Sequence, residues 1–349
     1  MIPRAILDDV MMDLAGMGLV VVTMWWGHRV THAAGGDPSA LIQFGGAVVA
    51  TYFIVRTVRQ ASVCAPPVAI LVAVALLSMW PVAAAGTPRT GEAFGALSYA
   101  NASAALYLLA AVSGLVLTRT AQSRTGRDLA TVAVVAVVVA VLASGSVAAI
   151  VLLALPAIAF RVRDPRSARI LLALGGAVLL TAVASTWWIA DRFEPADDGS
   201  RERVVVRALS PERLSYWSEA LDLAAEHPVT GVGAGRFRDL APSARGNVDA
   251  VAVHNEYLQA AAELGVVGLL LLLALMGWGF VRLAVSAHDP AAALAGAGLA
   301  ALGVQASIDY VLHAPAVVLV LAALLATGAG RLGGPPTREV IAETRLSAA

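Results

Sequence analysis

The chain has 349 residues, of which 59% are hydrophobic and 14% are charged, and its formal net charge is zero. Soluble domains carry about 25% charged residues, so this composition and a mean hydropathy of +0.77 exclude a soluble globular chain and predict extensive contact with lipid. The zero net charge argues against a nucleic-acid partner. The single cysteine, Cys64, excludes an internal disulfide framework and a cysteine-rich metal site.

Apolar runs of bilayer length define the organisation, because a helix needs about 20 residues to cross a hydrocarbon core about 30 Å thick. The sequence has ten such runs; the second, sixth and tenth are short, which leaves nine or eleven crossings and a re-entrant hairpin as alternatives. The predicted spans are residues 8–27, 39–55, 63–85, 97–117, 128–144, 146–160, 169–190, 264–286, 291–313 and 315–331. We therefore predict an all-α, polytopic integral membrane protein with one large extracytoplasmic loop.

Arginine positions predict the orientation, since positive charges in short loops accumulate on the cytoplasmic side. With a cytoplasmic N-terminus, the cytoplasmic segments hold fourteen arginines and the short external loops hold only Arg29 and Arg89. The segment from Asp191 to Glu263 carries eight more arginines outside, but it exceeds the length of about 60 residues over which the rule applies. The prediction is a multi-pass protein of the cytoplasmic (inner) membrane with both termini in the cytoplasm.

This topology divides the chain into four regions. They are an N-terminal transmembrane bundle of about seven helices (1–190), an extracytoplasmic catalytic loop (191–263), about three C-terminal transmembrane helices (264–331) and a cytoplasmic tail (332–349). Thirteen of the 24 acidic residues lie in the loop, so we expect the functional site there.

Within the loop, Ser210 is a good N-cap and Pro211 suits the first helical position, which predicts a helix ending at His227 and Pro228. Its narrow apolar face is expected to lie on the membrane interface or on the transmembrane bundle. This face consists of Leu214, Trp217, Leu221 and Ala224.

The glycine-rich run from Thr230 to Phe237 could be mistaken for a dinucleotide-binding fingerprint. That fingerprint requires a preceding buried strand and a following helix, and the sequence from Arg201 to Glu263 predicts no such unit. We expect the glycines to form a tight turn near the membrane surface or a ligand.

Several motifs follow one another around the loop: Arg213-x3-Trp217-x2-Ala220, His227-Pro228-Val229-Thr230-Gly231-Val232-Gly233, His254-Asn255-x-Tyr257-Leu258 and Glu263-x-Gly265-x2-Gly268. In this order they resemble the signatures of the O-antigen ligase and polymerase family of membrane glycosyltransferases. Weaker similarity extends to Tyr99 and Asn101, where Ala100 replaces the proline of the family's Tyr-Pro-Asn segment, and to Asp309 and Pro315. The resemblance covers roughly residues 90 to 330 and is strongest from Arg213 to Gly268.

The resemblance implies a GT-C-like membrane fold and transfer of a glycan from an undecaprenyl-diphosphate carrier to an acceptor hydroxyl at the outer face of the cytoplasmic membrane. The acceptor is a glycan, a lipid or a protein, and ligation and polymerisation remain equally open. The expected surroundings are membrane lipids, without nucleic acid and without a cofactor.

Chemistry suggests the two catalytic residues. A leaving diphosphate needs cationic stabilisation, and the guanidinium of Arg213 matches phosphate oxygens bidentately. The attacking hydroxyl needs a base, and histidine, with an unperturbed pKa of about 6.5, suits this role for His254. With arginine neutralising the diphosphate, no metal is required. The alternatives are a solvated helix start for His254 and a surface ion pair or aromatic contact for Arg213.

Other residues are predicted to bind substrate. Asn255, Tyr257 and Trp217 belong to the same motifs. Gln305, Asp309 and His313 fall at i, i+4 and i+8 of the ninth span, so we expect one polar stripe in which Asp309 holds His254 or an acceptor sugar. Asn101 is expected to complete this cavity. The alternatives are an interhelical hydrogen bond for Asp309 and a helix-end cap for Asn101.

One departure from the family pattern concerns a Ser-Arg-small triplet in a hairpin before the loop. Here Ser144-Gly145-Ser146 lacks the arginine, so Arg192, Arg201, Arg203 or Arg207 compensates, the donor differs, or activity is weak. The alternative functions are a transporter and a catalytically inactive assembly partner in polysaccharide export. A transporter predicts an inverted repeat of broken spans, which this sequence does not display.

Overall fold

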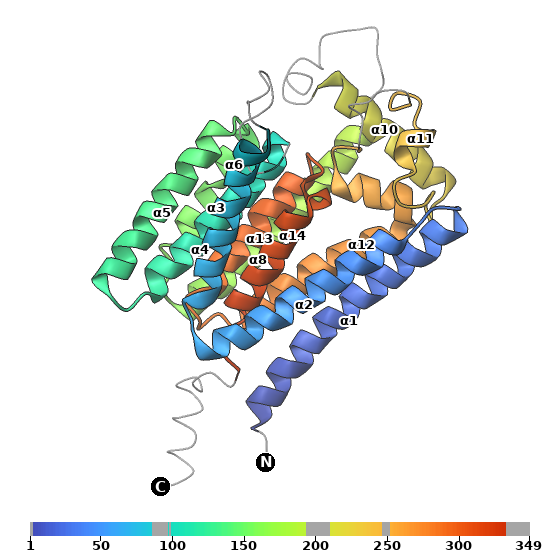
Figure 1. Cartoon of the computed structure of the whole chain (residues 1–349). Helices are drawn as coiled ribbons and strands as arrows, with labels where there is room; N and C mark the ends of the chain where they lie inside the picture. The colour runs from blue at the N-terminus through green and yellow to red at the C-terminus, as the bar shows by residue number, and fades with distance from the viewer. Residues whose placement is uncertain (1–2, 86–96, 98, 193–209, 246–251, 333–349) are drawn as a thin grey trace.

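The structure is a computed structural model that describes residues 3–85, 97, 99–192, 210–245 and 252–332 (Figure 1). Within these ranges the chain is all-α, as predicted, and contains no strand. The helices are α1 (Arg4–Ala33), α2 (Ser39–Ala61), α3 (Ala65–Ala85), α4 (Ala100–Thr120), α5 (Arg124–Ala143), α6 (Val147–Leu152), α7 (Ala154–Ala159), α8 (Pro165–Arg192), α10 (Pro211–Glu226), α11 (Phe237–Leu240), α12 (Glu256–Val285), α13 (Ala292–Ala306), the 3-10 turn η1 (Val311–His313) and α14 (Pro315–Gly328).

Every predicted apolar run overlaps a helix. In the described residues, α2, α4, α5, α8 and α12 are long and apolar enough to cross a membrane, and α3, α6 with α7, α13 and α14 supply shorter apolar segments. The sixth run is divided at Leu153 into two helices of 6 residues each. The number of crossings therefore stays a prediction, whereas the helical membrane-protein character is supported.

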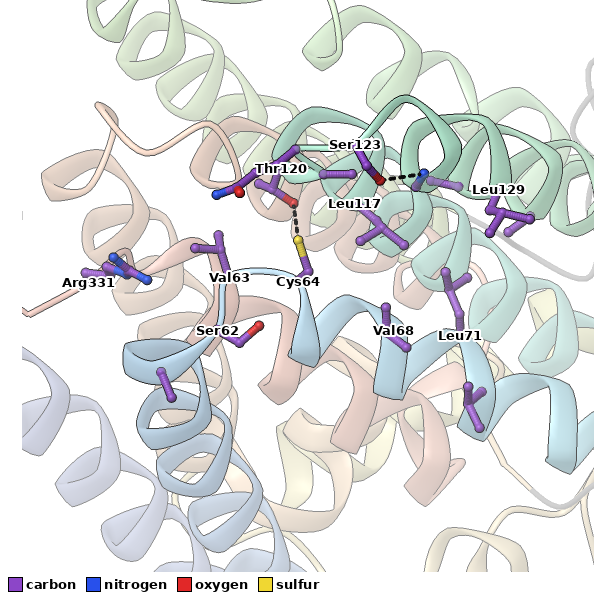
Figure 2. A pocket seen from close by; sticks show the side chains of 17 residues that line it. Ser62, Val63, Cys64, Val68, Leu71, Leu117, Thr120, Ser123, Leu129 and Arg331 are labelled. Carbon is purple, nitrogen blue, oxygen red and sulfur yellow. Dashed lines mark hydrogen bonds between the residues drawn. The ribbon is translucent and has the colours of Figure 1, made fainter.

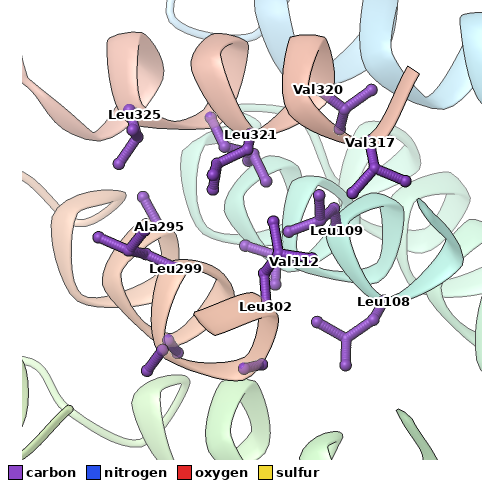
Figure 3. Packing of buried hydrophobic residues seen from close by; sticks show 14 of the residues in the cluster. Leu108, Leu109, Val112, Ala295, Leu299, Leu302, Val317, Val320, Leu321 and Leu325 are labelled. Atoms are coloured by element: carbon purple, nitrogen blue, oxygen red, sulfur yellow. The ribbon is translucent and has the colours of Figure 1, made fainter. Parts of the chain in front are cut away.

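The centre of the bundle is formed by α4, α13 and α14, whose apolar side chains interdigitate (Figure 3). Leu109 and Leu302 are among the fully buried members of this core. Close approach is possible because α13 is rich in alanine and glycine. At Gly296 an added Cβ would lie 2.0 Å from Leu172 Cδ2 of α8, so the glycine leaves room for this leucine side chain against α13.

Helix α5 lies at the side of the bundle (Figure 1), and several of its large apolar side chains are exposed. Leu129 and Val132 are 65% and 66% exposed. Such a surface is far too apolar for water, and it identifies the lipid-facing side of the molecule.

A buried group of charges joins α1, α2 and α12. Asp13, which is 4% exposed, accepts hydrogen bonds from Tyr52 Oη at 2.7 Å, Arg56 Nε at 2.8 Å and Arg282 Nε at 2.6 Å. Arg282 also lies 3.1 Å from Asp9. Arg56 and Arg282 are two of the fourteen arginines assigned to the cytoplasmic segments, and both are packing partners of α1.

Helix α12 is interrupted at Gly265, whose φ is 69°. The break leaves backbone groups of α12 without partners in the helix, and these groups form hydrogen bonds with residues 228–233. Val266 N donates to Pro228 O at 2.8 Å, and Gly233 N donates to Glu263 O at 2.8 Å. Gly231 has a φ of 63°, and a Cβ there would clash with the backbone of Glu263. The glycine-rich loop therefore packs its turn directly against the break in α12, in agreement with the expected tight turn.

A groove of about 690 Å³ lies between α3 and α5 (Figure 2). Leu117 and Thr120 of α4 contribute to its lining, and Cys64 Sγ faces Thr120 Oγ1 at 3.8 Å. None of the predicted site residues lines it.

Candidate active site

Asp309 is the centre of a polar cluster. Its carboxylate accepts hydrogen bonds from Tyr99 Oη, 2.7 Å from each oxygen, from Asn101 Nδ2 and, at 3.4 Å, from Arg213 Nη2. His254 Nδ1 lies 3.3 Å from Asp309 Oδ1, within ion-pair distance but outside hydrogen-bond geometry. The structure therefore brings together Arg213, His254, Asp309 and Asn101 from four separate parts of the sequence.

The position of Asp309 differs from the predicted one. Helix α13 ends at Ala306, and Asp309 lies in the turn before η1, so the continuous stripe through Gln305, Asp309 and His313 is wrong. The backbone leaves the helix because other elements bind this turn: Asn255 Nδ2 donates to Ser307 O at 2.7 Å, and Arg213 Nη1 donates to Ile308 O at 3.1 Å. The turn directs Asp309 toward α4 and α10.

The charge state of Asp309 follows from its partners. Burial alone would raise the pKa of this carboxyl, but the His254, Tyr99 and Arg213 contacts outweigh burial and lower its pKa. For Tyr99, burial and the adjacent Asp309 carboxylate both raise the phenol's pKa. At neutral pH the pair is consequently a carboxylate that accepts a hydrogen bond from an un-ionised tyrosine.

Aromatic rings surround His254. Tyr310 lies edge-on at 4.7 Å between ring centroids, and Tyr216 lies nearly parallel at 6.3 Å. The backbone of His254 has a φ of 57°, an uncommon left-handed conformation for a residue other than glycine. The side chains of His254 and Arg213 remain 14% and 25% exposed, against 3% for Asp309. A ligand can therefore reach the histidine and the arginine but not the carboxylate.

Helix α10 delivers Arg213 as predicted. Ser210 Oγ accepts a hydrogen bond from Arg213 N at 3.4 Å, and Pro211 is the first helical residue. The apolar face of α10 packs on the bundle, where Leu214 and Trp217 are completely buried with Leu258 of α12. The sequence left open whether this face lies on the membrane interface or on the transmembrane bundle, and in the structure it packs on the bundle.

Three predicted substrate-binding residues lie in the interior. Asn255 is the N-cap of α12, and its side chain accepts hydrogen bonds from Tyr257 N and Leu258 N. Tyr257 is fully buried, and its hydroxyl donates to Gly303 O at 3.0 Å. Trp217 is also fully buried. In this structure these side chains hold the site's framework together and offer no accessible surface to a substrate.

A second polar group adjoins Tyr310. His313 Nδ1 lies 3.1 Å from Glu256 Oε2, and His313 Nε2 lies 3.3 Å from Gln259 Nε2. Gln259 Oε1 in turn accepts a hydrogen bond from Val253 N at 3.2 Å, next to His254. The group thus supports the backbone that carries His254.

Sequence reasoning missed Tyr216 and Tyr310. Tyr216 precedes Trp217 and Tyr310 follows Asp309 in the chain. The available signal was an aromatic residue directly beside a predicted site residue, and both rings pack around His254.

The hairpin without an arginine is the turn between α5 and α6. Ser144 Oγ donates to Val141 O at 2.6 Å, and Ser146 is the N-cap of α6. Arg192 lies over the Trp188 ring at 4.5 Å. The other arginines named as substitutes, at positions 201, 203 and 207, lie outside the described residues. Among the described side chains, no group of three acidic, histidine or cysteine residues has a metal-binding arrangement.

A comparison with protein families gives a match, and no curated protein matches the chain. Residues 129–273 match the family model described as O-antigen ligase. The matched segment contains Arg213 and His254, whereas Asn101 and Asp309 lie on either side of it. The match supports membership of the O-antigen ligase and polymerase family and a role in glycan transfer during cell-surface polysaccharide assembly by a membrane protein.

Proposed function

We propose that the protein is a glycosyltransferase that moves a glycan from undecaprenyl diphosphate to an acceptor hydroxyl at the outer face of the cytoplasmic membrane. The observation that carries the proposal is the shared contact of Arg213 and His254 with Asp309. A permanent cation and an imidazole thereby share one partly accessible site, as the chemistry requires.

In the proposed reaction, the acceptor oxygen forms a bond to the anomeric carbon while the bond between that carbon and the diphosphate oxygen breaks. The bonding electron pair leaves with the carrier diphosphate, and Arg213 stabilises the negative charge that develops. The acceptor proton passes to His254. Because Nδ1 of His254 faces Asp309, Nε2 is the nitrogen assigned to take this proton, and the carboxylate stabilises the imidazolium that forms.

The small misalignment of His254 and Asp309 is compatible with this assignment. Catalytic hydrogen bonds are often long in the absence of substrate and shorten when it binds. The left-handed backbone at His254 also favours a functional role, because a strained residue persists only where surrounding contacts enforce it. At His254 these contacts come from both chain neighbours: Asn255 Nδ2 donates to Ser307 O, and Val253 N donates to Gln259 Oε1.

We further propose that α10, α11 and the Asp309 cluster face the extracytoplasmic side, with the N-terminus in the cytoplasm. The start of α1 and the helices α10 and α11 lie at opposite ends of the bundle, which agrees with this orientation (Figure 1). The four-region division of the chain is part of the same proposal, with α12 crossing the boundary between residues 263 and 264.

The test combines a deletion strain with one variant. Accumulation of single lipid-linked units in the deletion strain identifies a polymerase, and accumulation of chains identifies a ligase. His254→Ala is expected to reproduce the deletion phenotype at normal membrane abundance, whereas His288→Ala, an exposed histidine outside the site, is expected to behave as wild type. Unchanged lipid-linked glycans in the deletion strain would refute the proposed transfer and favour an assembly partner, and an active His254→Ala protein would refute the base.

A further inference from the structure

A second pocket, of about 480 Å³, lies where the end of α1 meets the glycine-rich loop and α11. Arg29 and Trp26 line it from α1, and His227 and Arg236 line it from the opposite wall. None of the residues that contact Asp309 lines this pocket. It is therefore a separate candidate site on the same end of the molecule.

The pocket is cationic. Its lining contains two arginines and a histidine and no acidic residue. Arg236 Nε lies 3.9 Å from a carboxylate oxygen of Asp239, whose side chain is 70% exposed. The same Arg236 Nε is shielded from solvent and has no hydrogen-bond partner in the structure. The donors of an exposed arginine such as Arg29 match the oxygens of a phosphate group.

The walls of the pocket are fastened to each other. Arg236 Nη1 donates to Ala34 O at 2.6 Å, and Ala234 N donates to Thr31 Oγ1 at 3.2 Å. Trp26 Nε1 donates to Leu264 O at 2.8 Å, beside the bend of α12. These contacts join α1 to residues more than 200 positions away. The two walls of the pocket are therefore held together by the protein's own hydrogen bonds.

The pocket lies at the boundary between the apolar and polar parts of α1. Val21 and Trp25 lie about two turns and one turn before Arg29 on α1. Their side chains are 60% and 57% exposed, as expected for side chains that face lipid. Tryptophan and arginine are typical of the level of lipid headgroups, where the ring contacts the acyl region and the cation contacts phosphate. A lipid whose chains follow the exposed face of α1 would bring its phosphate to Arg29.

We propose that this pocket binds the phosphate group of a membrane lipid, independently of the transfer reaction at Asp309. Arg29 and His227 contact the phosphate, while Arg236 adds positive charge and holds α1 in place through its hydrogen bond to Ala34 O. The occupant is a lipid from the leaflet next to α10, because Trp26 and Arg29 of the pocket lining follow the exposed Trp25 on α1.

The experiment measures lipid binding to the delipidated full-length protein in detergent by native mass spectrometry, with phosphatidylglycerol as the probe. Arg29→Gln is expected to weaken binding about three- to tenfold, since an exposed cation loses part of its effect to screening, and Arg29→Lys is expected to lose less. Arg29→Gln combined with His227→Gln is expected to lose more than either change alone. Arg238→Gln is the control, because Arg238 is exposed on the same α11 and does not line the pocket.

Thermal unfolding checks that each variant retains the wild-type fold, and Arg29→Lys provides a fallback with its charge intact. Equal binding by wild type and the combined Gln variant would overturn the proposal. Displacement of the lipid by inorganic phosphate at equal concentration would overturn the assignment to a lipid, since a free anion site needs no acyl chain. Loss of lipid binding with unimpaired glycan transfer would support the proposed independence of the two sites.

Discussion

The guanidinium of Arg213 lies 3.4 Å from the carboxylate of Asp309, although 96 residues separate them in the chain. A second donor of Arg213 binds Ile308 O at 3.1 Å, so one side chain of α10 secures the turn that carries Asp309. This link makes the proposed phosphate-binding residue also a positioning residue for the carboxylate beside His254.

Asp309→Asn is expected to slow glycan transfer by at least about a hundredfold, because an amide cannot stabilise an imidazolium and presents a donor where an acceptor is needed. Donor turnover by the purified protein in defined lipid measures the effect. Asp239→Asn, at a largely exposed position on α11, is the matched control. A rate for Asp309→Asn within a few-fold of wild type would remove Asp309 from the mechanism.

Arg213→Lys is expected to reduce donor turnover by roughly ten- to a hundredfold while keeping the positive charge, because an ammonium cannot replace the two-pronged contact of a guanidinium. Arg213→Ala is expected to be slower still. Arg238→Lys serves as the comparison on an exposed arginine. Near-native turnover by Arg213→Lys would show that Arg213 acts only as a charge near Asp309, without bidentate phosphate binding.

Asp13→Asn is expected to destabilise the bundle by about 3–5 kcal/mol, because it leaves the buried Arg56 and Arg282 without their shared carboxylate. Unfolding in mixed micelles measures this free energy. Asp8→Asn, five residues earlier and exposed on the same helix, is expected to change it by less than about 0.5 kcal/mol. Equal stability of the two variants would mean that water or lipid headgroups satisfy the arginines.

The contact between His313 and Glu256 predicts a pH dependence of stability. Burial alone would lower the pKa of His313, but Glu256 and Glu263 outweigh burial and raise it from 6.5 to about 9. A raised pKa means that the folded protein binds the proton more tightly than the unfolded chain. The stabilisation is therefore complete below about pH 6.5 and is lost as the pH rises through about 9.

The measurement is the difference in thermal midpoint between wild type and His313→Gln at several pH values from about 6 to 10. The difference is expected to shrink toward the alkaline end. His288→Gln corrects for the titration of an exposed histidine. A difference that does not vary with pH would mean that His313 is neutral when paired.

The short-range features of this protein were predictable from its sequence. The helix from Pro211 to Glu226 follows from a Ser210 cap, a proline at its first position and Pro228 after its end, and these signals act within a few residues. The apolar runs overlap helices for the same reason: hydrophobicity over about 20 residues is a local property that the lipid solvent enforces.

The prediction failed where helical periodicity was extended too far. The run at 291–313 suggested one helix, but the chain turns after Ala306 because Asn255 and Arg213 bind the backbone of the turn. The donors responsible come from α10 and the α12 cap, so no signal within residues 291–313 announces the break.

The sequence by itself determined the all-α membrane class, the loop helix and the candidate residues Arg213 and His254. Only the tertiary structure decided that Asp309 joins them with Tyr99 and Asn101, and that Tyr257 and Trp217 are buried. The physical reason is distance along the chain: Asn101 and Asp309 are 208 residues apart, and their contact depends on the packing of α4 against α13 and α14. Local patterns encode helices, whereas the meeting of their polar ends is a property of the assembled bundle.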